Sequence, residues 1–513
     1  MISRISQSLR RMAPWVRWAV LGLVVVLVAG VAVVFYRWVA YCGDGVEQVD
    51  GQCVGVTDGN VGLSPDIADV LGRIRAENAR VSASPQASVS VGYLLPLPKP
   101  GSNQNLATSL RHELEGAYTA QLRANHTIRL GGPPKLRLLV ANDGDGSAHW
   151  EQVVDVLLDA VNDQHSPLVS VVATGQSRAT TGSAISKLIS NHVPVIASRI
   201  TADSVTPPTE PSPVDGLLRL APRNTDQAVA AARYVKSRGK KRALIVQNDD
   251  QNDTYSHSLG AGFRRAFSDS GHTVLPRTET YNPKYGAVAS TMHDIATNTI
   301  CAARPDVVFF AGRSPELAAF VAALPQRTCG QLPVDIVTGS DAVDFGTAVA
   351  SGNRDLRNAL RADSRITVSY TALAHPRAWT VEPDSVNQNA TMDLRRNDCE
   401  VCFPHLFPGQ SLDDGAAIMG NDAIVTAAHA IRFGGPGTVN DRPLLLFQEF
   451  DRMHGARAVP GASGWLSFDN NGTAIDKAVP ILRVKSDGGV QFVQLSAPDD
   501  APCRPDTPPC TDR

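Results

Sequence analysis

From Ser88 onward, short runs of β-branched residues and leucine alternate with longer stretches in which small and apolar residues recur at helical spacing. This alternation predicts βαβ units, which build a parallel sheet with helices on both faces. The runs Leu168–Ala173 and Val307–Ala311 are apolar throughout, as is typical of strands that are buried on both sides. The chain is therefore expected to be an α/β protein with doubly wound parallel sheets.

The predicted strands are too many for one open sheet of this kind. They are Ser88–Leu95, Lys135–Asn142, Leu168–Ala173, Val193–Ala197, Arg242–Gln247, Val274–Tyr281, Val307–Ala311, Val334–Thr338 and Thr367–Tyr370. The predicted helices are Ala107–Ala124, His149–Asp163, Thr181–Asn191, Thr225–Ser237, Ser256–Ser270, Pro315–Leu324 and Asp414–Phe433. The proline-rich segment Thr206–Gly216, followed by Leu217–Leu220, indicates a crossing between two sheets. We expect two lobes, with functional residues in the loops that follow the strands.

An uncharged apolar run from Trp18 to Tyr36 is long enough, at about 1.5 Å per residue, to cross most of a hydrocarbon layer. Several arginines and no acidic residue precede it, namely Arg4, Arg10, Arg11 and Arg17. The positive-inside rule then places residues 1–17 in the cytoplasm and the bulk of the chain outside. We expect an uncleaved, single-pass membrane anchor at 18–36. A cleaved secretory signal and a lipoprotein anchor at Cys42 are the alternatives.

The charge balance argues against a polyanionic partner. The 48 Lys and Arg residues nearly match the 50 Asp and Glu residues, which gives a net charge of -2. No nucleic-acid partner is expected, because no long-range positive field would attract one. The sequence contains no P-loop and no Gly-x-Gly-x-x-Gly turn that opens a helix. We predict no cofactor and no metal.

Eight cysteines in an exported chain tend to pair. They fall into couples that are near in sequence, and the pairing hypothesis is Cys42 with Cys53, Cys301 with Cys329, Cys399 with Cys402, and Cys503 with Cys510. The CxxC spacing of the third couple also occurs in redox and metal motifs. It lacks the second ligand pair of a structural zinc site, so we interpret it as a loop disulfide.

One string suggests an enzyme. Val425–His429 looks like the histidine segment of trypsin-like proteases. However, the chain has no Gly-Asp-Ser-Gly-Gly segment, and the nearest serine match, Ser463, follows too closely to complete such a fold. His429 is instead interpreted as a helix residue, and no enzymatic activity is predicted.

The order and spacing of several short segments resemble the type I periplasmic-binding proteins, the family that includes the branched-chain amino-acid receptors of ABC importers. The resemblance covers roughly residues 87–495. Its segments are Val91–Leu97, Glu115–Ala117, Val193–Thr201, Leu218–Pro222, Asp226–Ala228, Asp249–Asp250 with Tyr255, Val307–Glu316, Thr338–Ala342, Asn421–Ala423, Gly461–Gly464 and Phe468–Gly472.

This resemblance implies two lobes that are joined by three hinge crossovers and close on a ligand. Lobe I would comprise 87–221 and 372–462, and lobe II would comprise 222–371 and 463–495, between a stalk at 37–86 and a tail at 496–513. The implied function is capture of a small polar solute for an ABC importer. The alternative is a membrane-anchored sensor or adaptor that docks with a signalling partner and has no transport role.

The resemblance also implies ligand-binding residues. They are Gln176, Ser177, Arg199 and Thr201 in lobe I, and Tyr255, Arg313, Ser314 and Asp341 in lobe II. Hydroxyls and helix N-terminal amides of lobe I would receive a carboxylate, and Asp341 would accept an α-amino group. Arg199 and Arg313 depart from the family's amino-acid binders. Two guanidiniums favour a more anionic solute, unless either arginine merely pairs with a surface carboxylate. The predicted ligand is therefore an amino acid or a related anion.

Overall fold

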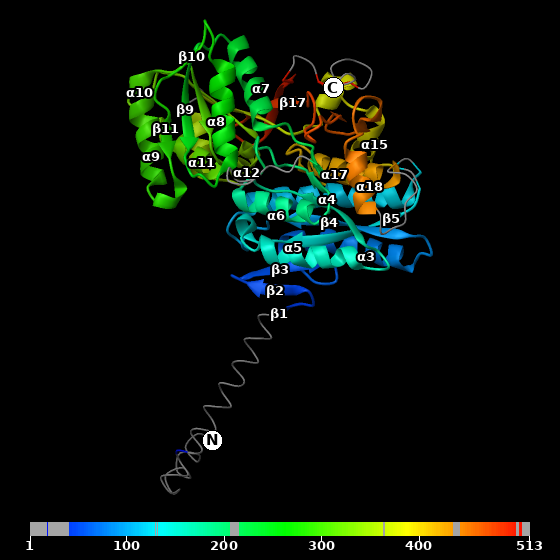
Figure 1. Ribbon diagram of the computed structural model, residues 1–513. Coiled ribbons are helices and arrows are strands. Elements are labelled where there is room, and N and C mark those ends of the chain that lie inside the picture. The colour runs from blue at the N-terminus through cyan, green and yellow to red at the C-terminus, as the bar shows by residue number, and fades with distance from the viewer. Residues whose placement is uncertain are drawn as a thin grey trace.

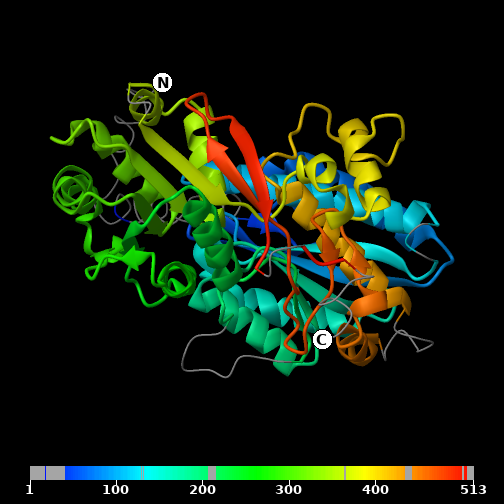
Figure 2. The same ribbon diagram turned by 90° about the horizontal axis from the view of Figure 1, so that it is seen from above.

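Two α/β lobes make up the computed structural model, which describes residues 18, 41–128, 130, 132–205, 215–362, 365–433, 442–498 and 502–504. Each lobe contains one large sheet, and helices cover both faces of each sheet (Figures 1 and 2). The late helices α17 (Ala416–Phe433) and α18 (Arg442–Phe450) lie with the early elements of lobe I, while the late strand β17 (Val479–Val484) lies with lobe II (Figure 1). The chain therefore passes between the lobes more than once, and the predicted two-lobed α/β class is confirmed.

The lobe I sheet has the strand order β1-β2-β3-β5-β4-β6-β7-β8. Its strands are β1 Tyr41–Gly43, β2 Val46–Val49, β3 Gln52–Thr57, β4 Ser88–Leu95, β5 Lys135–Asn142, β6 Leu168–Ala173, β7 Val195–Ala197 and β8 Leu217–Arg219. Its helices include α3 Ala68–Ala83, α4 Gln104–His126, α5 Trp150–Asp159, α6 Ala179–Ser190, α14 Ala378–Val381, α15 Gln388–Arg395, α16 Phe403–Leu406, α17 Ala416–Phe433 and α18 Arg442–Phe450. The strands β4 to β8 are parallel, so their carboxyl ends share one edge of the sheet.

The lobe II sheet has the order β10-β9-β12-β13-β14-β17-β18, with β11 also paired to β9. Its strands are β9 Arg242–Asn248, β10 Thr273–Val274, β11 Glu279–Tyr281, β12 Val307–Ala311, β13 Val334–Thr338, β14 Ile366–Thr371, β17 Val479–Val484 and β18 Val490–Ser496. Its helices include α7 Asn224–Ser237, α8 Thr254–Phe267, α9 Val288–Asp294, α10 Ile300–Ala303, α11 Ser314–Ala323, α12 Val343–Ala350 and α13 Arg354–Ala362. The single strand predicted at Val274–Tyr281 is two short strands, because Pro276 between them has no N–H to donate to a neighbouring strand.

The prediction of a stalk at 37–86 is wrong from residue 41 onward. The strands β1, β2 and β3 extend the lobe I sheet, and β3 pairs antiparallel with β5. The helix α3 packs on the same lobe, where Asn78 exchanges hydrogen bonds with the backbone of Leu138 on β5 (2.8 and 3.1 Å). The amide side chain of Asn78 thus provides hydrogen-bond partners for backbone groups of β5 that lie past the end of its pairing with β3. This segment is part of the lobe I core and not a spacer.

The third hinge crossover lies later than predicted. Residues after 463 still belong to lobe I, because Arg219 donates its backbone N–H to Gly472 (2.7 Å) and accepts one from Ala474 (3.2 Å). The chain enters the lobe II sheet only at β17, and it does so antiparallel to β14. The other two crossovers follow β8 and β14, close to the predicted boundaries.

Three of the predicted disulfides are confirmed: Cys42–Cys53, Cys301–Cys329 and Cys399–Cys402. Cys503 is also disulfide-bonded, while Cys510 lies outside the described residues. Apart from Trp18, the predicted anchor at 18–36 lies outside them as well. Within the described part of the chain, no helix combines the length and apolarity that a membrane crossing requires.

Glycines set the close approach of α4 and α17, the helices of lobe I that lie beneath the hinge. A Cβ atom on Gly116 would stand 1.9 Å from the carbonyl oxygen of Ala417, and one on Gly420 would stand 1.9 Å from the carbonyl oxygen of Glu113. Any side chain at either position would force the two helices apart. This packing therefore fixes where α4 presents its side chains to the hinge.

We expect Gly116→Ala to lower the free energy of unfolding by about 1–3 kcal/mol, because an added methyl group overpacks a dense interface. Gly72→Ala is the matched control, since Gly72 is an exposed residue of α3 and a Cβ there meets nothing within 4 Å. The control is expected to gain about 0.5–1 kcal/mol from helix propensity. Urea unfolding measures both, and equal stability of the two variants would contradict the close packing.

Candidate functional site

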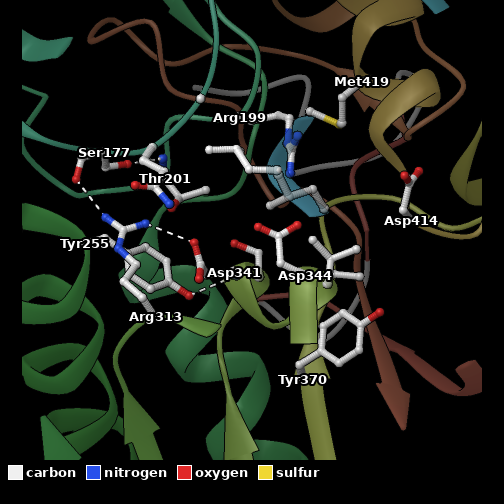
Figure 3. Close-up of a pocket in the computed structure, with 18 residues that line it drawn as sticks. Ser177, Arg199, Thr201, Tyr255, Arg313, Asp341, Asp344, Tyr370, Asp414 and Met419 are labelled. Carbon is white, nitrogen blue, oxygen red and sulfur yellow. Dashed lines mark hydrogen bonds and ion pairs between the residues drawn. The ribbon is translucent and has the colours of Figure 1, made fainter. Parts of the chain in front are cut away.

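A cavity of about 40 Å³ lies between the lobes, at the carboxyl ends of the parallel strands (Figure 3). It is lined by Leu106, Gly175, Gln176, Ser177, Arg199, Thr201, Tyr255, Arg313, Ser340, Asp341, Val343, Asp344, Tyr370, Ala372, Leu373, Asp414, Gly415 and Met419. Of the predicted binding residues, all except Ser314 line this cavity. Ser314 lies behind the wall, where its backbone N–H donates to Asp341 Oδ2 (2.8 Å).

Arg313 is the most highly bonded side chain in the wall. Its Nε and Nη2 donate to the two carboxylate oxygens of Asp253 (3.0 and 2.7 Å), and its Nη1 donates to Asp341 Oδ1 (3.1 Å). Its Nη2 also donates to the carbonyl oxygen of Ser177 (3.0 Å), which belongs to lobe I. The guanidinium stacks over the ring of Tyr255 at 4.4 Å. The residue therefore pairs with two carboxylates of the protein, of which Asp253 is buried and Asp341 has a side chain that is 10% exposed.

The charges around Arg313 stabilise one another despite burial. Burial lowers the pKa of Arg313, but Asp253 and Asp341 raise it more, so that the net shift is upward. Burial raises the pKa of Asp253, but the charge of Arg313 and its hydrogen bonds hold that pKa below its usual value. Arg313 and Asp253 are therefore both ionised at neutral pH. The network crosses the interlobe gap at the Ser177 carbonyl and joins the lobes there.

Arg199 enters the cavity from the loop after β7, on the lobe I side. Its Nη1 donates to Ser109 Oγ (2.8 Å) and reaches Glu113 Oε2 at 3.5 Å. Glu113 is fully buried on α4 and also accepts hydrogen bonds from the side chains of Tyr93, Thr174 and Ser198. In the described part of the chain only Nη1 of Arg199 has a side-chain partner. Its remaining N–H groups are therefore available to a ligand.

Two of the predicted ligand-binding residues of lobe I, Gln176 and Ser177, already accept hydrogen bonds from other groups of the protein. Ser177 Oγ accepts the backbone N–H groups of Thr201 (3.0 Å) and Ala202 (3.1 Å). Gln176 Oε1 accepts from Arg178 Nε (2.9 Å). These contacts hold the loops after β6 and β7 together, so Ser177 shapes the wall as well as lining it.

Asp344 was not predicted from the sequence. It lies at the start of α12, is 8% exposed, and points its carboxylate toward Arg199 across the cavity (Figure 3). Burial raises the pKa of Asp344 to about 7, the charges of Asp341 and Asp414 raise it as well, and Arg199 and Arg313 lower it. Its spacing from Asp341, three residues along the chain, was the only signal in the sequence.

Apolar side chains complete the wall. Leu106 and Met419 come from lobe I helices, Val343 from α12, and Leu373 from the segment that follows β14. Tyr370 on β14 adds an aromatic ring, and burial raises its pKa. The cavity therefore offers charged groups on both lobes beside an apolar surface, an arrangement typical of sites for small amphipathic solutes.

We expect Arg313→Met to lower the free energy of unfolding by about 3–5 kcal/mol, because it leaves Asp253 and Asp341 buried without their counter-ion. Arg277→Met serves as the control. Arg277 is 84% exposed in its ion pair with Glu279, so its loss is expected to change stability by less than about 1 kcal/mol. Urea unfolding at pH 7 compares the two variants. An Arg313→Met protein as stable as the control would show that the network contributes nothing.

Comparison of the sequence with models of protein families gives a match. Residues 108–356 match the model of a family described as periplasmic binding protein. No curated protein sequence matches the chain.

Solved structures share the fold. A leucine-binding protein from Thermotoga maritima is 21% identical, with a TM-score of 0.58 over 80% of this chain and 100% of that chain. An ABC transporter substrate-binding protein from Desulfitobacterium hafniense, solved with leucine, is 18% identical, with a TM-score of 0.57 over 79% of this chain and 100% of its own. A solute-binding protein from Rhodopseudomonas palustris, solved with 3,4-dihydroxybenzoic acid, is 14% identical, with a TM-score of 0.54 over 82% and 99%.

Proposed function

We propose that this chain captures a small polar solute between its lobes. The predicted resemblance to the type I periplasmic-binding proteins is confirmed, because residues 108–356 match the family model and the fold is shared. The observation that carries the proposal is the interlobe cavity. Both lobes contribute charged side chains to it, and both do so from loops at the carboxyl ends of parallel strands, where open α/β sheets bind ligands.

The lobes are in contact in this structure. Arg313 of lobe II donates to the Ser177 carbonyl of lobe I (3.0 Å), and Ala179 of lobe I donates its N–H to the carbonyl of Asn252 in lobe II (3.3 Å). A cavity of about 40 Å³ holds only about three water molecules. A larger solute therefore enters when the hinge opens, and closure encloses it.

The chemistry of the wall favours an amino acid over a simple anion. Arg199 faces Glu113, and Arg313 faces Asp253 and Asp341, so neither guanidinium adds uncompensated positive charge. This balance of charge weakens the case for a more anionic solute. The similar proteins from Desulfitobacterium hafniense and Rhodopseudomonas palustris hold leucine and an aromatic acid, and both of these ligands carry a carboxylate beside an apolar body.

The proposed setting is the outer face of a membrane. The apolar run at 18–36 would anchor the chain, and the captured solute would pass to an ABC permease. The second candidate is a membrane-anchored sensor or adaptor, which the uncleaved anchor favours. Crosslinking on intact cells separates them, because recovery of a permease supports transport and recovery of a signalling protein supports sensing.

For the purified full chain, calorimetric titration with the L-amino acids, benzoate and other small carboxylates is expected to find at least one ligand. Arg199→Met is expected to weaken its binding by about 10- to 100-fold, the worth of a charge-assisted hydrogen bond. Arg265→Met, which removes an exposed arginine of α8 outside the cavity, is the matched control and should bind normally. No binding by any compound, or equal binding by both variants, would refute the interlobe site.

A further inference from the structure

Asp344 is a buried carboxylate without a partner. The described residues provide it with no hydrogen bond and no ion pair, and its Oδ1 is fully enclosed. Its side chain nevertheless points into the cavity, toward the guanidinium of Arg199 (Figure 3). A buried charge without a partner costs several kcal/mol, and burial accordingly raises the pKa of Asp344 to about 7. A positively charged partner in the cavity would stabilise the ionised form of this carboxylate.

The neighbouring carboxylates all have partners. Asp253 and Asp341 share Arg313, Glu113 pairs with Arg199, and Asp414 pairs with His112 Nδ1 (2.6 Å). Burial lowers the pKa of His112, but the hydrogen bond and charge of Asp414 raise it more, so the net shift favours the charged imidazolium. Arg313, Arg199 and His112 are thus each matched by at least one carboxylate. Asp344 is the carboxylate of this group that has no such partner among the described residues.

Asp341 is poorly placed to bind a ligand's amino group, although the family resemblance suggested this role. Its Oδ1 accepts from Arg313 and its Oδ2 accepts from the backbone N–H of Ser314. Both oxygens of Asp341 are thus already engaged by the protein, and Arg313 balances its charge. Asp344, one turn further along the chain, faces the same cavity with both oxygens free of protein donors among the described residues.

We propose that Asp344, and not Asp341, binds a positively charged group of the ligand, so that the site selects solutes that carry an ammonium. The remaining N–H groups of Arg199 would hold the carboxylate of such a solute from the opposite lobe. The apolar body would lie against Leu106, Val343 and Met419. This inference rests on the proposed function and specifies the ligand class of the same cavity.

The titration of Asp344 gives the proposal a second readout. Arg199, Arg313, Asp341 and Asp414 face this carboxylate from the two lobes, and burial among them brings its pKa to about 7. A bound ammonium requires the ionised form, which exists above that pKa and is lost as the pH falls below it. Binding is therefore expected to strengthen by about tenfold between pH 6 and pH 8.

The test is calorimetric titration of the full chain. The amino acid that binds most tightly is compared with its analogue that lacks the amino group and with its analogue that lacks the carboxylate. Loss of the amino group is expected to weaken binding by at least about 30-fold. Asp344→Asn is expected to weaken binding of the amino acid by about 10- to 100-fold, to change binding of the deaminated analogue by less than about threefold, and to abolish the pH dependence.

The matched control is Asp355→Asn, which neutralises an exposed carboxylate of α13 in the same lobe and should bind normally. The rival assignment is tested by Asp341→Asn. If this variant alone lost the preference for the ammonium group, Asp344 would not be its acceptor. Tight binding of benzoate or of the deaminated analogue to the unaltered protein would also overturn the inference, while the proposed capture of a solute would stand. Only a failure of every compound to bind would contradict both the role of Asp344 and the proposed capture of a solute.

Discussion

Buried charges must be paired, and the pairing of Arg313 is the contact on which the arrangement of the two lobes depends. This guanidinium holds Asp253 at the start of α8, Asp341 after β13, and the Ser177 carbonyl across the gap. Asp253 in turn caps α8, and Asp341 accepts the first backbone N–H of α11. One side chain therefore orients two helices of lobe II and the loop of lobe I that faces them.

Lobe I has a corresponding centre in Glu113. The close approach of α4 and α17, which only glycine permits at Gly116 and Gly420, sets the position of this residue. Its carboxylate gathers the hydroxyls of Tyr93, Thr174 and Ser198 and orients Arg199 toward the cavity. The two lobes thus present one arginine each, and both arginines are held by buried carboxylates. Asp344 differs from every other carboxylate of the wall because none of the described residues provides it with a hydrogen bond or an ion pair.

The sequence predicted the architecture well, because the central strands are rich in apolar and β-branched residues. The strands Ser88–Leu95, Lys135–Asn142 and Leu168–Ala173 have the expected bounds. The edge strands β1 to β3 were missed, since they are short, rich in polar residues and glycine, and stabilised by pairing with β5. The strands β17 and β18 were missed as well, because their antiparallel place in lobe II follows from the late third crossover.

The sequence predicted where the site lies, but not which of its charged side chains pair with one another. Loops after parallel strands converge at one edge, so Arg199, Arg313 and Asp341 could be placed near one another. Which carboxylate faces which guanidinium depends on contacts between loops far apart in the sequence, as the approach of Arg313 to Ser177 illustrates. Asp344 stood out only once burial and missing partners were known.

The most direct test of this account is a crystal structure of the full chain with the amino acid that binds it most tightly. The account predicts that the ligand lies between the lobes, with its carboxylate at Arg199 and its ammonium within hydrogen-bond distance of Asp344. A ligand bound elsewhere, for example in the groove of lobe I lined by Arg123, Asn387 and Met392, would contradict it.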